Sequence, residues 1–223
     1  MSNIYRMAQI NRQIAGFLLQ TKAVILEPAK PFRWASGWLS PIYCDNRITL
    51  SFPDIRDRIR DAFVETIREH YGTPAVIAGV ATGAIAQGAL VADRMNLPFV
   101  YVRSSAKEHG RQNVIEGRIS AGDSVVVVED LVSTGGSSLG AVGALRQAGA
   151  EVTGMVAIFS YGFRMAEERF RREEVPLVTL SDYDTLIQLA VESGYIREEQ
   201  VRMLGQWKED PAGWPGKQPK TTS

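Results

Sequence analysis

The chain has 223 residues, of which 45% are hydrophobic and 22% charged, as expected for a single globular domain with a sizeable core. Lysine plus arginine and aspartate plus glutamate both number 25, so the zero formal net charge gives no general reason to expect a nucleic-acid or membrane partner. The single cysteine, Cys44, excludes an internal disulfide and suits a reducing compartment. No segment has the pattern of a signal peptide or a membrane span, so we expect a soluble, cytoplasmic protein.

The first predicted element is a helix over residues 3–20, where apolar side chains recur at helical spacing. Residues 31–50 are rich in aromatic side chains and are interrupted by Gly37 and Pro41, so we predict no regular element there. A second helix is predicted to begin near Pro53.

From residue 74 onward, predicted strands alternate with predicted helices. The strands are expected at 74–80, 97–103, 124–129, 151–159 and 176–181, and the helices at 83–95, 137–148, 183–193 and 197–208. This alternation is typical of an α/β fold with a mostly parallel sheet. The residues from about 210 to 223 lack periodicity and are predicted to form a loose tail, and no linker divides the chain into two domains.

The four valines at 125–128 run directly into Glu129 and Asp130, and then into a loop of small residues. A run of β-branched residues predicts a strand buried on both faces, whereas two carboxylates are costly to bury and are expected at the sheet's edge, facing a cleft. Backbone N–H groups of such a loop and of the helix that follows it can converge on a phosphate. The acids can accept hydrogen bonds from sugar hydroxyls. The pattern indicates a ribose 5-phosphate site, with an ordinary βα turn as the alternative.

Two further loops carry residues suited to anion binding. The loop 79–83 joins a predicted strand to a helix and can present N–H groups to a second anion, although a tight turn packed through its glycines explains it equally well. The segment 103–118 is polar and carries Arg103, Lys107 and His109, which suit a cover that closes over an anion. A solvated hairpin is the alternative for this segment.

These motifs together resemble the type I phosphoribosyltransferase family. Glu129-Asp130 followed by LVSTGGS resembles its signature for 5-phosphoribosyl 1-diphosphate (PRPP). YVR-x-x-x-K-x-H-G at 101–110 is similar to the catalytic loop of the orotate phosphoribosyltransferases, and F-x-W-A-S-G-x-x-S-P-x-Y-x-D-N-R at 32–47 to their amino-terminal segment. The resemblance implies a core over about 51–180, with a mostly parallel sheet flanked by helices. It also implies a hood formed mainly by residues 1–50 and C-terminal elements.

The resemblance also implies roles for individual residues. Lys107, His109 and Asp130 are expected to be catalytic. The expected PRPP-binding residues are Arg103, Lys107, His109, Glu129, Asp130, Leu131, Val132, Ser133, Thr134, Gly135, Gly136 and Ser137. The expected pyrophosphate loop is Ala81, Thr82 and Gly83, and orotate is expected to contact Ser133, Tyr43 and Ser36. The family also implies Mg²⁺ held mainly through substrate and water, and a homodimer in which the loop 104–117 reaches the neighbouring site.

Some positions depart from the family's pattern. Ile25 and Leu39 stand where relatives carry lysines, and Ser104 stands where many have a second basic residue. An arginine found near Ser160 in some relatives has no counterpart here. The carboxylate of orotate must therefore be held by other groups, with backbone N–H groups or Arg33 as candidates.

The implied activity is transfer of ribose 5-phosphate from PRPP to orotate, giving orotidine 5′-phosphate and pyrophosphate in de novo pyrimidine synthesis. Two alternatives stay open. A phosphoribosyltransferase for a purine or another base would share the core but would not need the segment 32–47. A non-catalytic regulator on the same fold would bind PRPP as an effector, but the zero net charge and the cationic loop argue against it.

Overall fold

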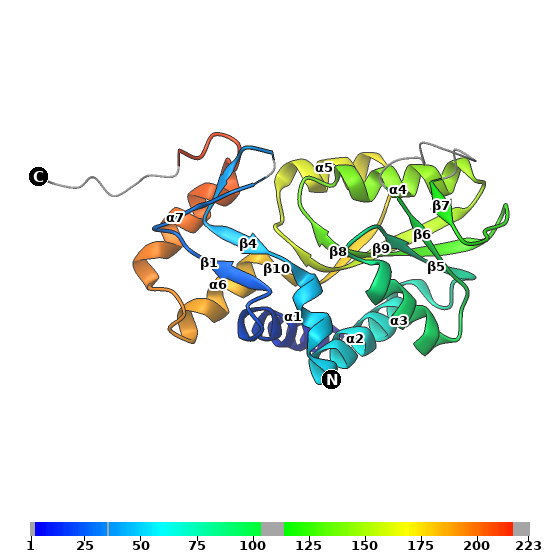
Figure 1. Ribbon diagram of the computed structural model, residues 1–223, viewed down its shortest axis with the longest axis horizontal. Helices are drawn as coiled ribbons and strands as arrows, with labels where there is room; N and C mark the ends of the chain where they lie inside the picture. The colour runs from blue at the N-terminus through cyan, green and yellow to red at the C-terminus, as the bar shows by residue number, and fades with distance from the viewer. Residues whose placement is uncertain (1–2, 35, 104–113, 216–223) are drawn as a thin grey trace, which may run out of the picture.

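A six-stranded sheet forms the centre of the computed structural model, which describes residues 3–34, 36–103 and 114–215 (Figure 1). Its strands, in spatial order, are β10 (Leu177–Asp182), β9 (Glu151–Ser160), β8 (Ser124–Val132), β5 (Val76–Val80), β6 (Phe99–Val102) and β7 (Ile115–Glu116). The first five are parallel, and β7 pairs antiparallel with β6. This arrangement confirms the predicted α/β fold with a mostly parallel sheet.

Helices cover both faces of the sheet, which explains why β5 and the valine run of β8 are apolar. Figure 1 shows α1 (Asn3–Gln20), α2 (Pro53–Tyr71) and α3 (Ile85–Met95) below the sheet and α4 (Gly136–Gln147) and α5 (Arg164–Arg172) above it. Between these layers every residue of β5 is buried, and the four valines of β8 are inaccessible to solvent. The last helices, α6 (Tyr183–Glu192) and α7 (Glu198–Glu209), lie at the end of the molecule away from β7.

Strand β8 is longer than predicted and contains the two acids. It continues to pair with β9 through Leu131 and Val132, so Glu129 and Asp130 lie inside the ladder and not after its end. Glu129 is 3% exposed, so the expectation that both acids face an open cleft is wrong for this residue. The strand continues through the acids because neighbouring groups provide hydrogen bonds that offset the cost of burying Glu129.

The aromatic segment before α2 is regular, contrary to the sequence-based expectation. Strand β1 (Val24–Leu26) pairs with β4 (Ile42–Cys44), β2 (Phe32–Arg33) pairs with β3 (Leu39–Ser40), and η1 (Asn46–Ser51) is a 3₁₀ helix. Strands of two or three residues are too short to show an alternating pattern. Helix α5 was also missed, because only Ala166 and Phe170 of its nine residues are buried.

The C-terminal helix packs against these N-terminal strands. The indole N–H of Trp207 in α7 donates to the backbone oxygen of Leu39, at 3.2 Å, and its ring lies 5.7 Å from that of Trp34. Beyond α7, Pro211 and Trp214 are buried, so the first residues of the predicted tail are packed. Within the described part of the chain, no helix combines the length and the apolar character needed to cross a membrane.

Candidate active site

The loop between β8 and α4 has the shape expected of an anion-binding turn. Gly135 precedes α4 with a φ of +79°, and a Cβ added there would lie 3.1 Å from the ring of Phe170, so the position requires glycine. The guanidinium of Arg169 in α5 donates to the backbone oxygen of Thr134, at 2.9 Å. The loop is therefore held in place by α5, while the first N–H groups of α4 have no partner within their own helix and can bind an anion.

The two acids of β8 form one hydrogen-bonded unit with α4. The carboxylate of Glu129 accepts from the Ser138 hydroxyl, at 2.7 Å, and from the backbone N–H of Asp130, at 3.0 Å. Burial raises the pKa of Glu129 well above its usual range, and the neighbouring charge of Asp130 adds to this effect. Burial also raises the pKa of Asp130, which is less enclosed. Asp130 is therefore the acid better placed to meet a ligand.

The loop before α3 meets Asp130 directly. A Cβ added to Gly83 would overlap the Asp130 carboxylate, so the close approach depends on glycine at this position. The backbone N–H of Ala81 donates to Val102 of β6, at 2.8 Å, the Ala81–Thr82 peptide is cis, and Thr82 is exposed. The fold thus brings the two predicted anion loops together at the carboxyl ends of adjacent parallel strands, where open α/β sheets bind their ligands.

Arg103 stands just after β6, on the same side of the sheet. Its guanidinium lies 3.5 Å from the Glu116 carboxylate, and its backbone N–H donates to Val114 at 2.8 Å. Arg103 therefore lies at the carboxyl end of β6, directly before residue 104 in the chain. The predicted catalytic residues Lys107 and His109, and the departure at Ser104, lie outside the described residues.

A cavity of about 310 Å³ opens between the N-terminal strands and the end of the sheet. Its lining consists of Arg33, Trp34, Tyr43, Cys44, Leu131, Ser133 and Tyr161. Two of the three predicted orotate-binding residues, Tyr43 and Ser133, are therefore brought together from distant parts of the chain. Ser36 does not line this cavity; it is exposed, and its hydroxyl accepts from the backbone N–H of Trp38 at 3.4 Å.

Asn46 links the N-terminal segment to the acids, a role that sequence reasoning missed. Its side-chain amide donates to the backbone oxygen of Asp130, at 2.6 Å, and accepts from the Cys44 thiol, at 3.3 Å. The side chain is buried, so both contacts are protected from water. Asn46 belongs to the D-N-R motif at 45–47, and this motif was the feature of the sequence that could have pointed to it. Its partner Asp130 lies 84 positions away, so the motif does not reveal the contact.

Cys44 and Tyr161 complete the inner wall of the cavity. Burial raises the pKa of the Cys44 thiol well above its usual range, with the charge of Asp130 adding to this, as expected for a packed residue and not a nucleophile. Tyr161 is 1% exposed, and its ring lies 5.2 Å from that of Trp34. Among the described residues its hydroxyl has no hydrogen-bond partner, and no sequence pattern had pointed to it.

Comparison with known proteins gives a consistent answer. The phosphoribosyl transferase domain family matches residues 50–188. The orotate phosphoribosyltransferase of Cytophaga hutchinsonii is 55% identical over 203 residues, which cover 91% of this chain and 97% of that protein. The orotate phosphoribosyltransferase of Bacteroides thetaiotaomicron is 56% identical over 208 residues, which cover 93% of this chain and 98% of that protein.

Solved structures agree with these sequence relatives. The orotate phosphoribosyltransferase of Aeropyrum pernix superposes with a TM-score of 0.72 at 29% identity, covering 82% of this chain and 99% of that one. The UMP synthase of Leishmania donovani gives a TM-score of 0.74 at 28% identity. The match covers 88% of this chain and 42% of that one. The fold and its paired anion loops therefore define a phosphoribosyltransferase of type I.

Within that class, the chain belongs to the orotate phosphoribosyltransferases. It is a pentosyltransferase that forms orotidine 5′-phosphate and pyrophosphate from PRPP and orotate, in pyrimidine synthesis. The family, fold and activity expected from the sequence are confirmed.

Proposed function

We propose that the transfer takes place where β8, the loop 81–83 and the N-terminal segment meet, with Lys107, His109 and Asp130 as the catalytic residues. The observation that carries this proposal is the position of Asp130. Its carboxylate packs against Gly83, and its backbone oxygen accepts a hydrogen bond from Asn46. One residue thus touches the segments assigned to ribose, pyrophosphate and base.

PRPP lies across the carboxyl ends of β8 and β5 in this proposal. Asp130 accepts hydrogen bonds from the ribose hydroxyls, and Glu129 supports it from within β8 by accepting from its backbone N–H. The backbone of residues 131–137 holds the 5-phosphate, assisted by the Thr134 and Ser137 hydroxyls. The loop of small residues and the adjoining helix N-terminus support this assignment. The acids and the loop of small residues follow one another along the chain, which supports a sugar bound next to its phosphate, as in a ribose 5-phosphate.

Cleavage of the C1–O bond leaves positive charge on the ribose and negative charge on the departing pyrophosphate. Asp130 lies on the ribose side and stabilises the cationic carbon, whereas Arg103, Lys107 and His109 offset the charge of the leaving group together with the N–H groups of residues 81–83. His109 suits proton exchange with the pyrophosphate near neutral pH. Closure of the loop 104–117 excludes water, which would otherwise hydrolyse the reacting sugar.

Orotate occupies the cavity of about 310 Å³ beside this site. Tyr43 provides an aromatic face for the planar ring, and Ser133 provides a hydroxyl at the start of the phosphate loop. Both residues line the cavity, which supports their assignment, whereas Ser36 does not and takes no part in this proposal.

Mg²⁺ is the proposed cofactor, and it neutralises part of the pyrophosphate charge when bound. Among the described residues, no group of three or more histidine, cysteine, aspartate or glutamate side chains could hold a metal ion. A Mg²⁺ ion held mainly through substrate oxygens and water does not require such a group.

The assembly and the division of the chain are also part of the proposal. Residues 1–50 and the C-terminal elements act as a hood over the core at 51–180. Two copies form a homodimer, in which the loop 104–117 of each reaches the other's site, and the enzyme works in the cytoplasm. The packing of Trp207 against β3 supports the inclusion of α7 in the hood.

The first test is an activity assay on the purified protein with Mg²⁺, PRPP and orotate, followed by the ultraviolet absorbance of orotate. We expect orotate consumption that requires PRPP and falls by about 10²–10³-fold in Lys107→Ala, because one cation that offsets transition-state charge is lost. Lys30→Ala, an exposed lysine outside the site, serves as the control and should retain activity. Wild-type rates in Lys107→Ala would contradict the assignment of the cationic loop. Turnover with adenine, hypoxanthine or uracil in place of orotate would contradict the base subsite.

A further inference from the structure

Arg33, whose side chain is exposed, brings a positive charge to the base cavity. It is the one cationic side chain among the seven described residues that line the cavity. Its guanidinium donates to the backbone oxygen of Gly37, at 3.2 Å, within its own hairpin, and it forms no ion pair with an acid of the described residues. Arg47, by contrast, is held by Asp45 through two hydrogen bonds of 2.7 and 2.8 Å.

Two carboxylates also lie near the cavity. Asp130 and Asp45 both lie close enough to Cys44 to raise the pKa of its thiol further. Arg47 is engaged by Asp45 and also acts on Asp130, whereas Arg33 has no acidic partner among the described residues. A neutral pyrimidine can enter such a cavity without a counter-charge. A base with a carboxylate requires one, because a buried charge without a partner is strongly disfavoured.

We propose that Arg33 binds the carboxylate of orotate and makes the enzyme select this base over uncharged pyrimidines. The proposal rests on the orotate phosphoribosyltransferase activity and adds the residue that determines acceptor specificity. The planar guanidinium matches a carboxylate with two parallel hydrogen bonds. Since Arg33 has no acidic partner among the described residues, binding orotate does not require an existing ion pair to break.

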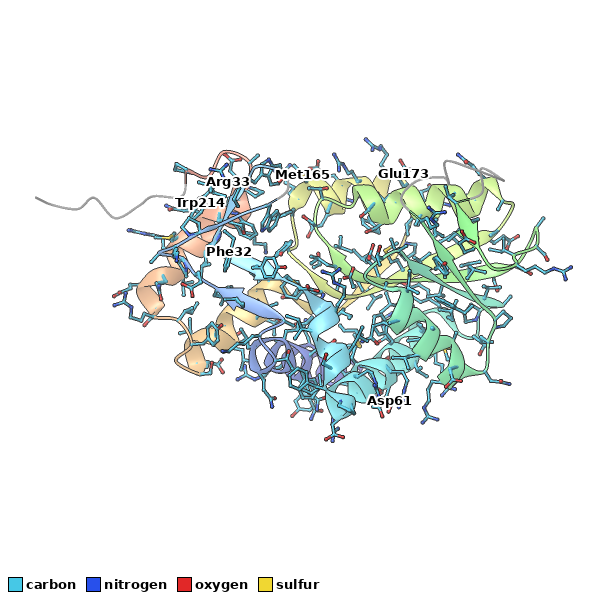
Figure 2. All side chains as sticks on the ribbon, in the orientation of Figure 1. Phe32, Arg33, Asp61, Met165, Glu173 and Trp214 are labelled. Carbon is cyan, nitrogen blue, oxygen red and sulfur yellow. The ribbon has the colours of Figure 1, made fainter. Side chains whose placement is uncertain are left out.

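The backbone next to Arg33 is held in place by the contacts of Trp34. The next residue, Trp34, donates from its indole to the Ile42 oxygen at 3.3 Å and packs against Tyr161 and Trp207. Its backbone N–H donates to Trp38, at 2.9 Å, which closes the β2–β3 hairpin. Figure 2 labels Arg33 on these N-terminal strands, at the same end of the molecule as Trp214.

The register of the β2–β3 hairpin identifies position 39 as a second place from which a positive charge can be supplied. Arg33 pairs directly with Leu39 on the antiparallel strand. Directly opposed residues point to the same face, with Cβ atoms about 4.5–5.5 Å apart. A lysine at position 39 therefore projects from the same face of the hairpin as Arg33 and can carry a cation toward the same end of the ligand.

The test compares orotidine 5′-phosphate with uridine 5′-phosphate, two nucleotides that differ only in the carboxylate on the base. Equilibrium binding is measured by calorimetry for the wild-type protein and for Arg33→Gln. We expect the affinity for orotidine 5′-phosphate to fall by about 10–100-fold in the variant, the range for one charge-assisted pair. The affinity for uridine 5′-phosphate and the KM for PRPP should stay within about twofold. Lys30→Gln removes the same charge from a nearby exposed position and should change the affinity for neither nucleotide.

Two further variants separate a specific contact from a structural effect. Arg33→Lys keeps the charge but loses the planar fork, so it should retain part of the preference for orotidine 5′-phosphate. Arg33→Gln combined with Leu39→Lys should recover part of the preference lost in the single variant, because the charge returns from the opposing strand. Circular dichroism spectra establish that each variant is folded.

Several results would overturn the proposal. Equal losses of both nucleotides in Arg33→Gln would show that the residue supports the structure of the cavity and does not bind the carboxylate. Unchanged binding of orotidine 5′-phosphate would assign the carboxylate to another group. Both results leave intact the orotate turnover of the wild-type enzyme, which is measured separately, so failure of this inference is distinguishable from failure of the proposed active site.

Discussion

Glu129 shows how a single buried acid depends on its immediate partners. Its carboxylate is enclosed within β8, and the two hydrogen bonds from Ser138 and the Asp130 N–H only partly replace water. Burial therefore favours the protonated form, which is why the pKa of Glu129 is raised. In an unfolded chain the same carboxyl titrates near its ordinary value of about 4.3.

This difference predicts how folding stability depends on pH. The protonated Glu129 contributes stability that is fully present below about pH 4.3 and is lost as pH rises through the higher folded-state pKa. Glu129→Gln does not titrate, so its free energy of unfolding should decline less than that of the wild type between about pH 4.3 and neutrality. Urea unfolding at a series of pH values measures this slope. Glu151→Gln, at an exposed position of β9, is the matched control. Parallel curves for wild type and Glu129→Gln would argue against a raised pKa.

At the scale of elements, the site depends on how closely a loop can approach a strand. The loop before α3 reaches β8 because Gly83 has no side chain to separate it from Asp130. The same principle holds at Gly135, where the ring of Phe170 and a positive φ both exclude a larger residue. The N-terminal ends of α3 and α4 thus meet the pair of acids in β8, an arrangement suited to a substrate with phosphates at both ends.

Gly83→Ala should therefore impair the site more than the fold. The added methyl group overlaps the Asp130 carboxylate and must displace either the loop or the acid. We expect kcat/KM to fall by about 10²-fold or more, with a stability loss of about 1–3 kcal/mol. Gly143→Ala is the matched control, because nothing lies within 4 Å of its new Cβ and alanine favours the helix. Steady-state kinetics and urea unfolding measure both variants, and wild-type activity in Gly83→Ala would contradict the packing argument.

For the whole molecule, an aromatic cluster joins the two ends of the chain across the base cavity. Trp207 from α7 contacts Trp34 of the N-terminal segment and Tyr161 at the end of β9, with ring centroids 5.7 and 5.5 Å apart. Its indole also donates to the Leu39 oxygen in β3. The position of the β2–β3 hairpin over the sheet therefore depends on a helix that is more than 160 residues further along the chain.

Trp207→Ala should consequently weaken both the fold and the base subsite. Removing this fully buried side chain should cost about 3–5 kcal/mol of unfolding free energy. The KM for orotate should rise more than the KM for PRPP, because the lost contacts support the cavity and not the phosphate loop. Trp207→Phe keeps an aromatic ring but loses the hydrogen bond to Leu39, so it should cost less. Equal increases in both KM values would show that Trp207 acts on the fold as a whole.

Sequence patterns alone predicted every strand of the sheet except β7, most of its covering helices, and the loops to which we assign the phosphate chemistry. These features are local: a valine run buried on both faces, apolar side chains at helical spacing, and small residues before a helix each leave a pattern within about ten residues. The resemblance in the motifs at 32–47, 101–110 and 129–137 was sufficient to predict the family and the reaction.

The tertiary structure alone decided which residues meet. Asn46 and Asp130 are 84 positions apart, and nothing in either segment specifies their hydrogen bond. The cavity that joins Arg33 to Tyr161 likewise depends on packing between distant segments. The burial of Glu129 also followed from its surroundings, because the cost of enclosing a carboxylate depends on whether Ser138 and a backbone N–H lie within hydrogen-bonding distance. Local patterns specify elements, but long-range packing brings together the side chains that we propose to bind and select the substrate.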